Sequence, residues 1–84
     1  MSVALTAEQR SAIQRDFPPA DRADIERLLT DECSTNLPFL AQNREPDIQR
    51  IRNAVLNLSA GNTNKFLYWL GIAKQDWRDV LQGN

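Results

Sequence analysis

Histidine is absent from this chain of 84 residues, and cysteine occurs once, at Cys33. Without histidine, the chain lacks the commonest general base and the commonest metal ligand of proteins. A single thiol cannot form a disulfide within the chain, and it cannot hold zinc without soft or imidazole ligands beside it. We therefore expect Cys33 to be a small buried apolar residue. We expect no enzymatic activity, no cofactor and no metal.

Glycine and long apolar runs are also scarce. Glycine occurs three times, at Gly61, Gly71 and Gly83, which is too sparse for a phosphate-binding loop. No apolar run approaches the roughly 20 residues that a membrane-spanning helix needs. The N-terminal sequence MSVALTAEQR lacks the basic start and the apolar run of a signal peptide. Together with the single thiol, these absences predict a cytoplasmic protein that has no membrane partner.

Neither sign of charge dominates, since the formal net charge is −1 and the sequence pI is about 5.2. Proteins that bind phosphate backbones usually have a concentrated basic face and a high pI, so the composition argues against a nucleic-acid partner. Two pairs of carboxylates at i, i+3 have a spacing that suits a divalent cation, Asp21 with Asp24 and Asp76 with Asp79. Both pairs fall at predicted helix starts, where capping and the helix dipole favour acids without any metal.

Local signals predict α-helices in the N-terminal half. Thr6 and Gln9 form a capping box for a first helix, which the prolines after residue 17 end. Pro19 suits the first turn of a second helix, which runs to Cys33. Apolar residues lie on one face of this second helix: Ile25, Leu28, Leu29 and Cys33.

A third helix is expected from Pro46 to a turn at Gly61, and a fourth helix follows that turn. The third helix has a regular apolar stripe: Ile48, Ile51, Val55 and Leu58. Two interpretations are open for the end of the fourth helix. It either continues to Leu81 without interruption, or it breaks at Asp76, whose carboxylate then caps a final turn. In both cases we expect Trp77 to pack inward.

The expected fold is therefore all-α, a compact bundle of four to five short helices in a single domain of residues 1–84. Residues 1–5 precede the first cap, and we expect them to be disordered. Residues 34–45 form an apolar connecting loop, in which Pro38 disfavours helix. Its large apolar side chains are expected to tuck against the core: Leu37, Phe39 and Leu40.

Two short motifs stand out in the C-terminal half. The first is the helix end LNLSAG at residues 56–61, and the second is Ala-Lys-x-Asp-Trp-Arg-Asp at residues 73–79, followed by Val80-Leu81. With FPPADRADIERLL at residues 17–29, they make the chain resemble a group of small bacterial all-helical proteins over most of residues 17–81. That group has no assigned activity, so the resemblance implies a bacterial origin and adds no chemistry.

The apolar surface of the fourth helix points to protein interaction. Its first turns are apolar almost all round, and so short a domain cannot bury every face of such a helix. We expect Tyr68, Trp69 and Ile72 to be at least half-exposed, as a binding surface for another protein or for a second copy of the chain. In the other interpretation the first helix covers this side, with Ile13 and Phe17 against Trp69.

Arg78 and Asp79 complete the predicted interaction surface. Both follow Trp77 in a polar stretch, and we expect Arg78 to pair with Asp31, Glu32 or another acid. Arginine and the large aromatic residues are the types that dominate binding energy at protein interfaces. The leading interpretation is therefore a small non-enzymatic interaction module that acts as an adaptor, a regulator or an inhibitor of another protein.

A weak nucleic-acid-binding domain is the alternative interpretation. Residues 46–78 could form a helix-turn-helix, with Lys65 near the start of its second helix. Further basic residues surround that helix: Arg50, Arg52, Lys74 and Arg78. A recognition helix needs outward polar residues near its N-terminus, whereas this one begins NTNKFLYWLGIA and is strongly apolar. The pattern therefore favours a protein partner over nucleic acid.

Overall fold

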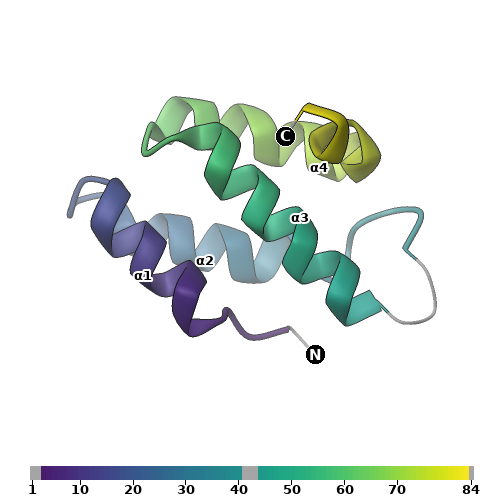
Figure 1. The fold of residues 1–84 in the computed structure, drawn as a ribbon, viewed down its shortest axis with the longest axis horizontal. Helices are drawn as coiled ribbons and strands as arrows, with labels where there is room; N and C mark the ends of the chain where they lie inside the picture. The colour runs from purple at the N-terminus through teal and green to yellow at the C-terminus, as the bar shows by residue number, and fades with distance from the viewer. Residues whose placement is uncertain (1–2, 41–43, 84) are drawn as a thin grey trace.

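Four α-helices make up most of the described chain (Figure 1). The computed structural model describes residues 3–40 and 44–83. Within these residues there is no strand, and the helices are α1 (Ala7–Asp16), α2 (Arg22–Glu32), α3 (Arg44–Ser59) and α4 (Thr63–Gly83). The radius of gyration is 11.6 Å, close to the value of about 12 Å that a folded domain of this length has. The predicted all-α bundle is confirmed.

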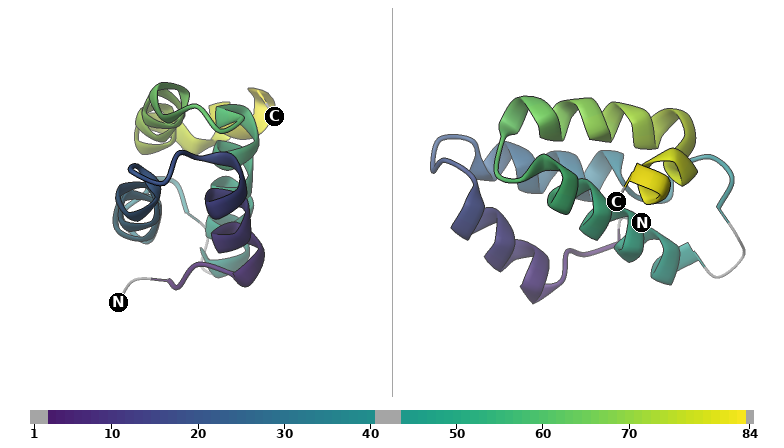
Figure 2. Two further views of the ribbon diagram at one scale, coloured as in Figure 1. Left: turned by 90° about the vertical axis from the view of Figure 1, so that its left-hand side faces the viewer. Right: turned by 45° about the horizontal axis from the view of Figure 1, so that its top comes forward.

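The helices pack as two crossed layers. In one layer α1 lies beside α3, and in the other α2 lies beside the first part of α4 (Figure 2). Two polar contacts hold the second pair: Thr63 Oγ1 donates to Asp21 Oδ2 at 2.7 Å, and Lys74 forms an ion pair with Glu32. Both contacts join residues that are 42 positions apart, so α2 and α4 run in the same direction with a fixed register.

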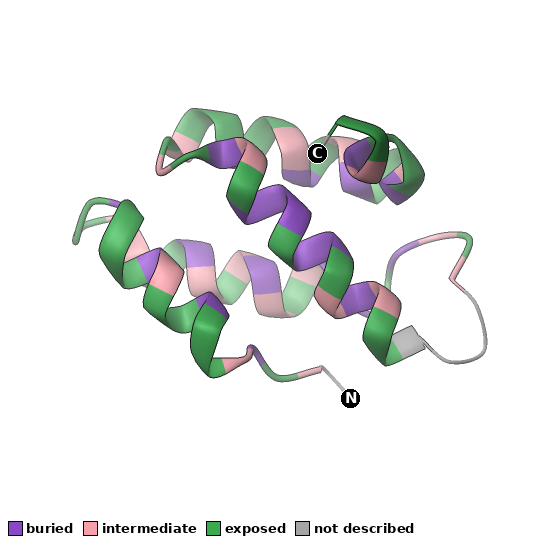
Figure 3. Cartoon of the chain, viewed as in Figure 1, coloured by how far each residue is buried: buried purple, intermediate pink, exposed green. Residues whose placement is uncertain are grey.

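The core lies between the two layers (Figure 3). α4 contributes a buried stripe at helical spacing: Phe66, Leu70, Ala73 and Trp77. The ring of Phe17 packs edge-on against Phe66, with the centroids 5.9 Å apart and the planes at 82°. Cys33 is fully buried, as predicted, and this burial raises the pKa of its thiol to about 12. The thiol is therefore part of the core and stays protonated at neutral pH.

The start of α1 has the predicted capping box. Thr6 Oγ1 accepts the N–H of Gln9 at 3.1 Å, and Gln9 Oε1 accepts the N–H of Thr6 at 3.0 Å. The prediction that Pro19 lies in the first turn of α2 is wrong. The N–H of Asp21 donates to the carbonyl of Pro18 at 2.9 Å, so the two prolines form a separate turn, and α2 begins only after it.

Gly61 forms the turn between α3 and α4, as predicted. Its φ is +78°, and a Cβ at this position would lie 2.4 Å from the carbonyl oxygen of Asp16 at the end of α1. Both features require glycine. Asn62 then caps α4, because its Oδ1 accepts the N–H of Lys65 at 3.0 Å.

The segment before α1 lies along the bundle. Residues 1–5 were expected to be disordered, and of these residues 3–5 are described. The N–H of Val3 donates to Ser34 Oγ at 3.3 Å, and the side chain of Leu5 is buried in the core. The carbonyl groups of this segment accept hydrogen bonds from Arg52, which is fully buried. Residues 1–2 lie outside the described residues.

Only some of the apolar side chains of the connecting loop after α2 pack against the core. Leu37 is buried and Leu40 is partly buried, as predicted. The prediction is wrong for Phe39, whose side chain points outward and is 62% exposed. The loop is also shorter than predicted, because α3 begins at Arg44. Residues 41–43 of the predicted loop lie outside the described residues.

Candidate protein-interaction surface

α4 breaks at Asp76, in agreement with the second interpretation of its end. The backbone of Asp76 has φ −160° and ψ 100°, outside the helical range. Its Oδ1 accepts the N–H of Arg78 at 3.1 Å, so the carboxylate caps the terminal turn. As a result, residues 77–83 turn away from the axis of the first part of α4 (Figure 1).

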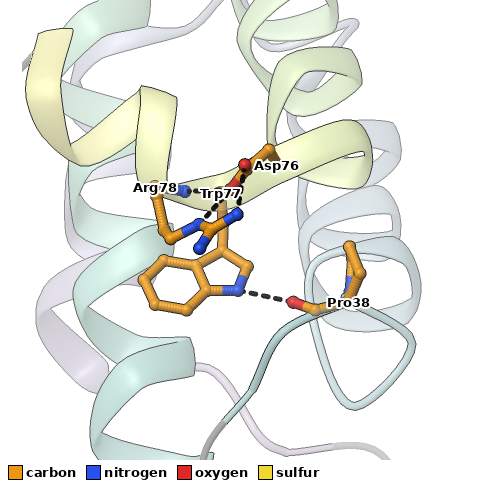
Figure 4. A network of polar contacts seen from close by, with 4 residues as sticks. All are labelled: Pro38, Asp76, Trp77 and Arg78. Atoms are coloured by element: carbon orange, nitrogen blue, oxygen red, sulfur yellow. Dashed lines mark hydrogen bonds and ion pairs between the residues drawn. The ribbon is translucent and has the colours of Figure 1, made fainter.

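Trp77 fastens this terminal turn to the connecting loop. Its side chain is 8% exposed, so it packs inward as predicted. Its indole Nε1 donates to the carbonyl of Pro38 at 2.6 Å (Figure 4). One buried side chain therefore holds two segments that are 39 positions apart in sequence.

Arg78 forms a clamp beside Trp77. Its Nε and Nη2 donate to the two carboxylate oxygens of Asp76 at 2.8 and 2.7 Å (Figure 4). Arg78 was expected to pair with Asp31, Glu32 or another acid, and Asp76 is the acid. Hydrogen bonding from Arg78 is the main reason that the pKa of Asp76 is lowered. Asp79 is exposed and forms no ion pair within the described residues.

The exposed ring of Phe39 lies against this clamp. The Arg78 guanidinium carbon lies 4.4 Å from the ring centroid, a cation–π contact. The φ of Phe39 is +61°. This left-handed conformation costs a bulky residue about 1–2 kcal/mol. The strained backbone of Phe39 thus holds its ring at the surface, where the outer side of the ring faces solvent.

The outward face of α4 is formed by Leu67, Tyr68 and Gly71. Leu67 and Tyr68 are 49% and 61% exposed, and with Phe39 they are the large apolar side chains that the described residues expose. Gly71 is three and four positions further along, so the three residues share one face. A Cβ added at Gly71 would meet no heavy atom within 4 Å. No side chain of the described residues therefore covers the helix surface at Gly71.

Trp69 and Ile72 lie at the edge of this face and are partly buried. Tyr68 packs edge-on against Trp69, with the ring centroids 5.2 Å apart. The far side of Trp69 faces the end of α4, since a Cβ at Gly83 would lie 3.1 Å from Trp69 Cη2. The terminal turn is therefore a neighbour of Trp69, whereas α1 directs Phe17 at Phe66.

The predicted interaction residues thus fall into two groups. Tyr68 and Trp69 are in contact on α4, and Arg78 is in contact with Asp76 and Phe39. The predicted interaction residues did not include three residues that lie on these surfaces, Phe39, Leu67 and Gly71. Gly71 could have been found from its position three residues after Tyr68. Nothing in the sequence distinguishes Phe39 from the buried leucines beside it.

The basic residues that the helix-turn-helix interpretation invoked are mostly engaged elsewhere. Arg52 is fully buried and donates to backbone carbonyls, so it cannot contact phosphate. Arg50, Lys74 and Arg78 form ion pairs with Asp47, Glu32 and Asp76 respectively. Lys65 has no ion pair within residues 3–40 and 44–83.

A shallow groove of about 400 Å³ lies between α1 and α3, lined by polar side chains together with Ala12 and Leu56. Gln9 at its floor uses its amide to donate to Gln49 Oε1 at 2.9 Å and Asn53 Oδ1 at 3.1 Å. Among the residues with described positions, no three acidic or thiol groups come close enough together to hold a metal ion. The groove offers no nucleophile beside a general base.

Comparison of the chain with known protein families, with curated proteins and with solved structures finds no match. The resemblance to small bacterial helical proteins therefore stays a prediction. Within residues 3–40 and 44–83, the helices are too short or too polar to cross a membrane.

Proposed function

We propose that this protein is a non-enzymatic interaction module that binds another protein through the outward face of α4. The proposed partner element is an amphipathic helix that carries acidic residues, and the module acts on that partner as an adaptor, a regulator or an inhibitor. The observation that carries the proposal is the open position at Gly71 beside the exposed side chains of Leu67 and Tyr68.

No close packing within the described residues requires glycine at position 71. In the interior of an exposed helix it costs about 1 kcal/mol relative to alanine, and no described atom uses the space above it. The neighbours of Gly71 on the helix surface are Leu67, Tyr68, Lys74 and Gln75. Four residues around a small one form the type of hole into which a side chain of a facing helix fits.

The charge of α4 supports an acidic partner. Between residues 63 and 75 the helix carries Lys65 and Lys74 and no acidic residue. Glu32 already neutralises Lys74, which leaves Lys65 to attract a carboxylate. A second copy of α4 packed in antiparallel orientation would bring lysines of like charge together, so the charge pattern favours a different protein.

Capture from extracts of the source cells with matched variants tests this proposal. Tyr68→Glu and Gly71→Gln change the outward face. Gln14→Glu is the control, because it adds the same charge as Tyr68→Glu at an exposed position of α1. We expect a protein that the wild type and Gln14→Glu retain and both face variants lose. Circular dichroism checks that each variant is folded.

Two outcomes would contradict the proposal. One is a captured protein that both face variants retain as well as the wild type does. The other is a wild-type dimer in light scattering that Tyr68→Glu dissociates, which would make the second copy the partner and refute the acidic helix.

A further inference from the structure

Arg52 is a buried cation that pairs with no carboxylate of the described residues. Its side chain is fully buried, and it is in no ion pair within the described residues. Burial lowers the pKa of the guanidinium, and main-chain carbonyl groups take the place of a counter-ion.

These carbonyl groups come from two separate segments. At the end of α2, Arg52 Nε donates to the carbonyl of Cys33 at 2.8 Å, and Nη2 reaches that of Thr30 at 3.3 Å. The other two belong to the segment before α1: Nη2 donates to Val3 at 2.8 Å and Nη1 to Ala4 at 3.1 Å. α2 has no basic residue in its own last turn, so Arg52 supplies the cation that this helix end favours.

Residues 3–5, which we call the strap, are held almost entirely by their main chain. Besides the bonds from Arg52, Ser34 Oγ accepts the N–H of Val3 and Gln49 Nε2 donates to the carbonyl of Ala4 at 3.1 Å. The Ala4 side chain is exposed, and Leu5 alone buries its side chain in the core. This pattern is that of an extended peptide in a binding groove: main-chain bonds give affinity, and one side chain gives specificity.

We propose that Ser34, Gln49, Arg52 and the pocket of Leu5 form a peptide-binding groove that the strap occupies in the free protein. Its ligand is an extended segment of another protein, which offers two successive carbonyl groups followed by a leucine. The strap then acts as a competitor within the chain. Its high effective concentration keeps the groove closed, and only the fraction of molecules with an open strap binds the ligand.

The strap already fits the groove, so a peptide with the sequence of the strap is the probe. We would titrate the complete chain carrying Leu5→Asn with the peptide acetyl-Ser-Val-Ala-Leu-Thr-amide and follow the amide signals of Ser34, Gln49 and Arg52 by NMR. The variant lacks the anchor of the strap but keeps every side chain of the groove. We expect saturable binding that is at least about tenfold tighter than to the wild type, whose strap competes.

A peptide with asparagine in place of leucine is the matched control, and we expect it to bind at least about tenfold more weakly. A folded Leu5→Asn chain that shows no saturable binding would overturn the proposal. A wild-type dimer in which the strap enters the groove of a second copy would also overturn it, because the ligand would then be this chain.

Hydrogen exchange on the wild type tests the proposal even where Leu5→Asn fails to fold. An open strap exposes to water the Nη hydrogens of Arg52 that donate to Val3 and Ala4, so we expect these hydrogens to exchange at least about 100-fold faster than the core amide of Val55. Equal exchange of the two groups, through global unfolding alone, would show that the strap does not open and would refute a self-occupied groove.

Discussion

Two glycine-to-alanine substitutions in this chain should change stability in opposite directions. Gly71→Ala should stabilise the protein, because the new Cβ meets no heavy atom within 4 Å and alanine is the best helix former. Gly61→Ala should destabilise it, because φ is +78° and the Cβ would lie 2.4 Å from the carbonyl of Asp16. The two variants have the same change in composition and differ only in local structure.

The magnitudes follow from the helix and the turn. In the interior of a helix, alanine gains about 1 kcal/mol over glycine. For a domain of this size that gain raises Tm by about 4–8 °C. At Gly61 the left-handed backbone alone costs alanine about 1–2 kcal/mol. The backbone of Asp16 must also shift, so we expect a total loss of about 2 kcal/mol or more and a fall in Tm of about 10 °C.

Thermal and urea unfolding followed by circular dichroism measure both effects, at a concentration where light scattering shows a single species. A Gly71→Ala variant that is no more stable than the wild type would refute the reasoning. It would mean that another part of the free protein occupies the space above Gly71. The outward face of α4 would then be part of the core, and the proposed interaction surface would be lost with it.

Three further substitutions test other parts of the structure. Trp77→Phe should lower the free energy of unfolding by about 1–2 kcal/mol in urea titrations, because it leaves the partly buried carbonyl of Pro38 without its indole donor. It should also speed hydrogen exchange in the loop, and unchanged exchange would contradict the anchoring. Phe39→Gly should change the free energy of unfolding by less than about 1 kcal/mol, because glycine relieves the left-handed backbone strain and this gain offsets the lost cation–π contact. Leu37→Ala, at a buried position of the same loop, is the control and should lower the free energy of unfolding by about 2–3 kcal/mol. Cys33→Ala should flatten the fall of stability at high pH. The thiol has a pKa of about 12 when folded and about 8.5 when unfolded, so the unfolded state loses its proton first, and stability falls as pH rises from about 8.5 towards 12. Between pH 8 and 10 the wild type should lose about 2 kcal/mol more than the variant, and equal slopes would show that the thiol is not buried.

The helices could be predicted from sequence because their signals are local. The capping box at Thr6 and the left-handed turn at Gly61 need no partner outside a few residues, and both are confirmed. The role of Arg52 could not be predicted in this way. Its four acceptors come from residues 3, 4, 30 and 33, and no local pattern reveals that these groups meet at one side chain.

The interaction surface was predictable only in part, for the same reason. The apolar character of the first part of α4 indicates that some of it stays exposed, and the exposure of Tyr68 agrees with this. Which side of the helix is covered depends on the break at Asp76, which turns the end of the chain towards Trp69. Sequence alone left that break as one of two interpretations, because an aspartate can either cap the start of a new helical turn or lie within a continuous helix, and the residue type does not distinguish the two.

The stability of so small a domain makes its surface features informative. A domain of this length has a free energy of unfolding of about 4–13 kcal/mol. Gly71 costs about 1 kcal/mol through lost helix propensity, and the left-handed backbone of Phe39 costs about 1–2 kcal/mol. Neither cost is recovered by burial, because Gly71 faces open space and Phe39 is 62% exposed. The cation–π contact with Arg78 offsets part of the cost at Phe39, whereas a Cβ at Gly71 would meet no heavy atom of the described residues within 4 Å. Both features lie on the surface next to exposed apolar or charged groups, where contacts with a partner can compensate for them. Under the proposed function, contact with a partner helix would compensate for the cost of Gly71.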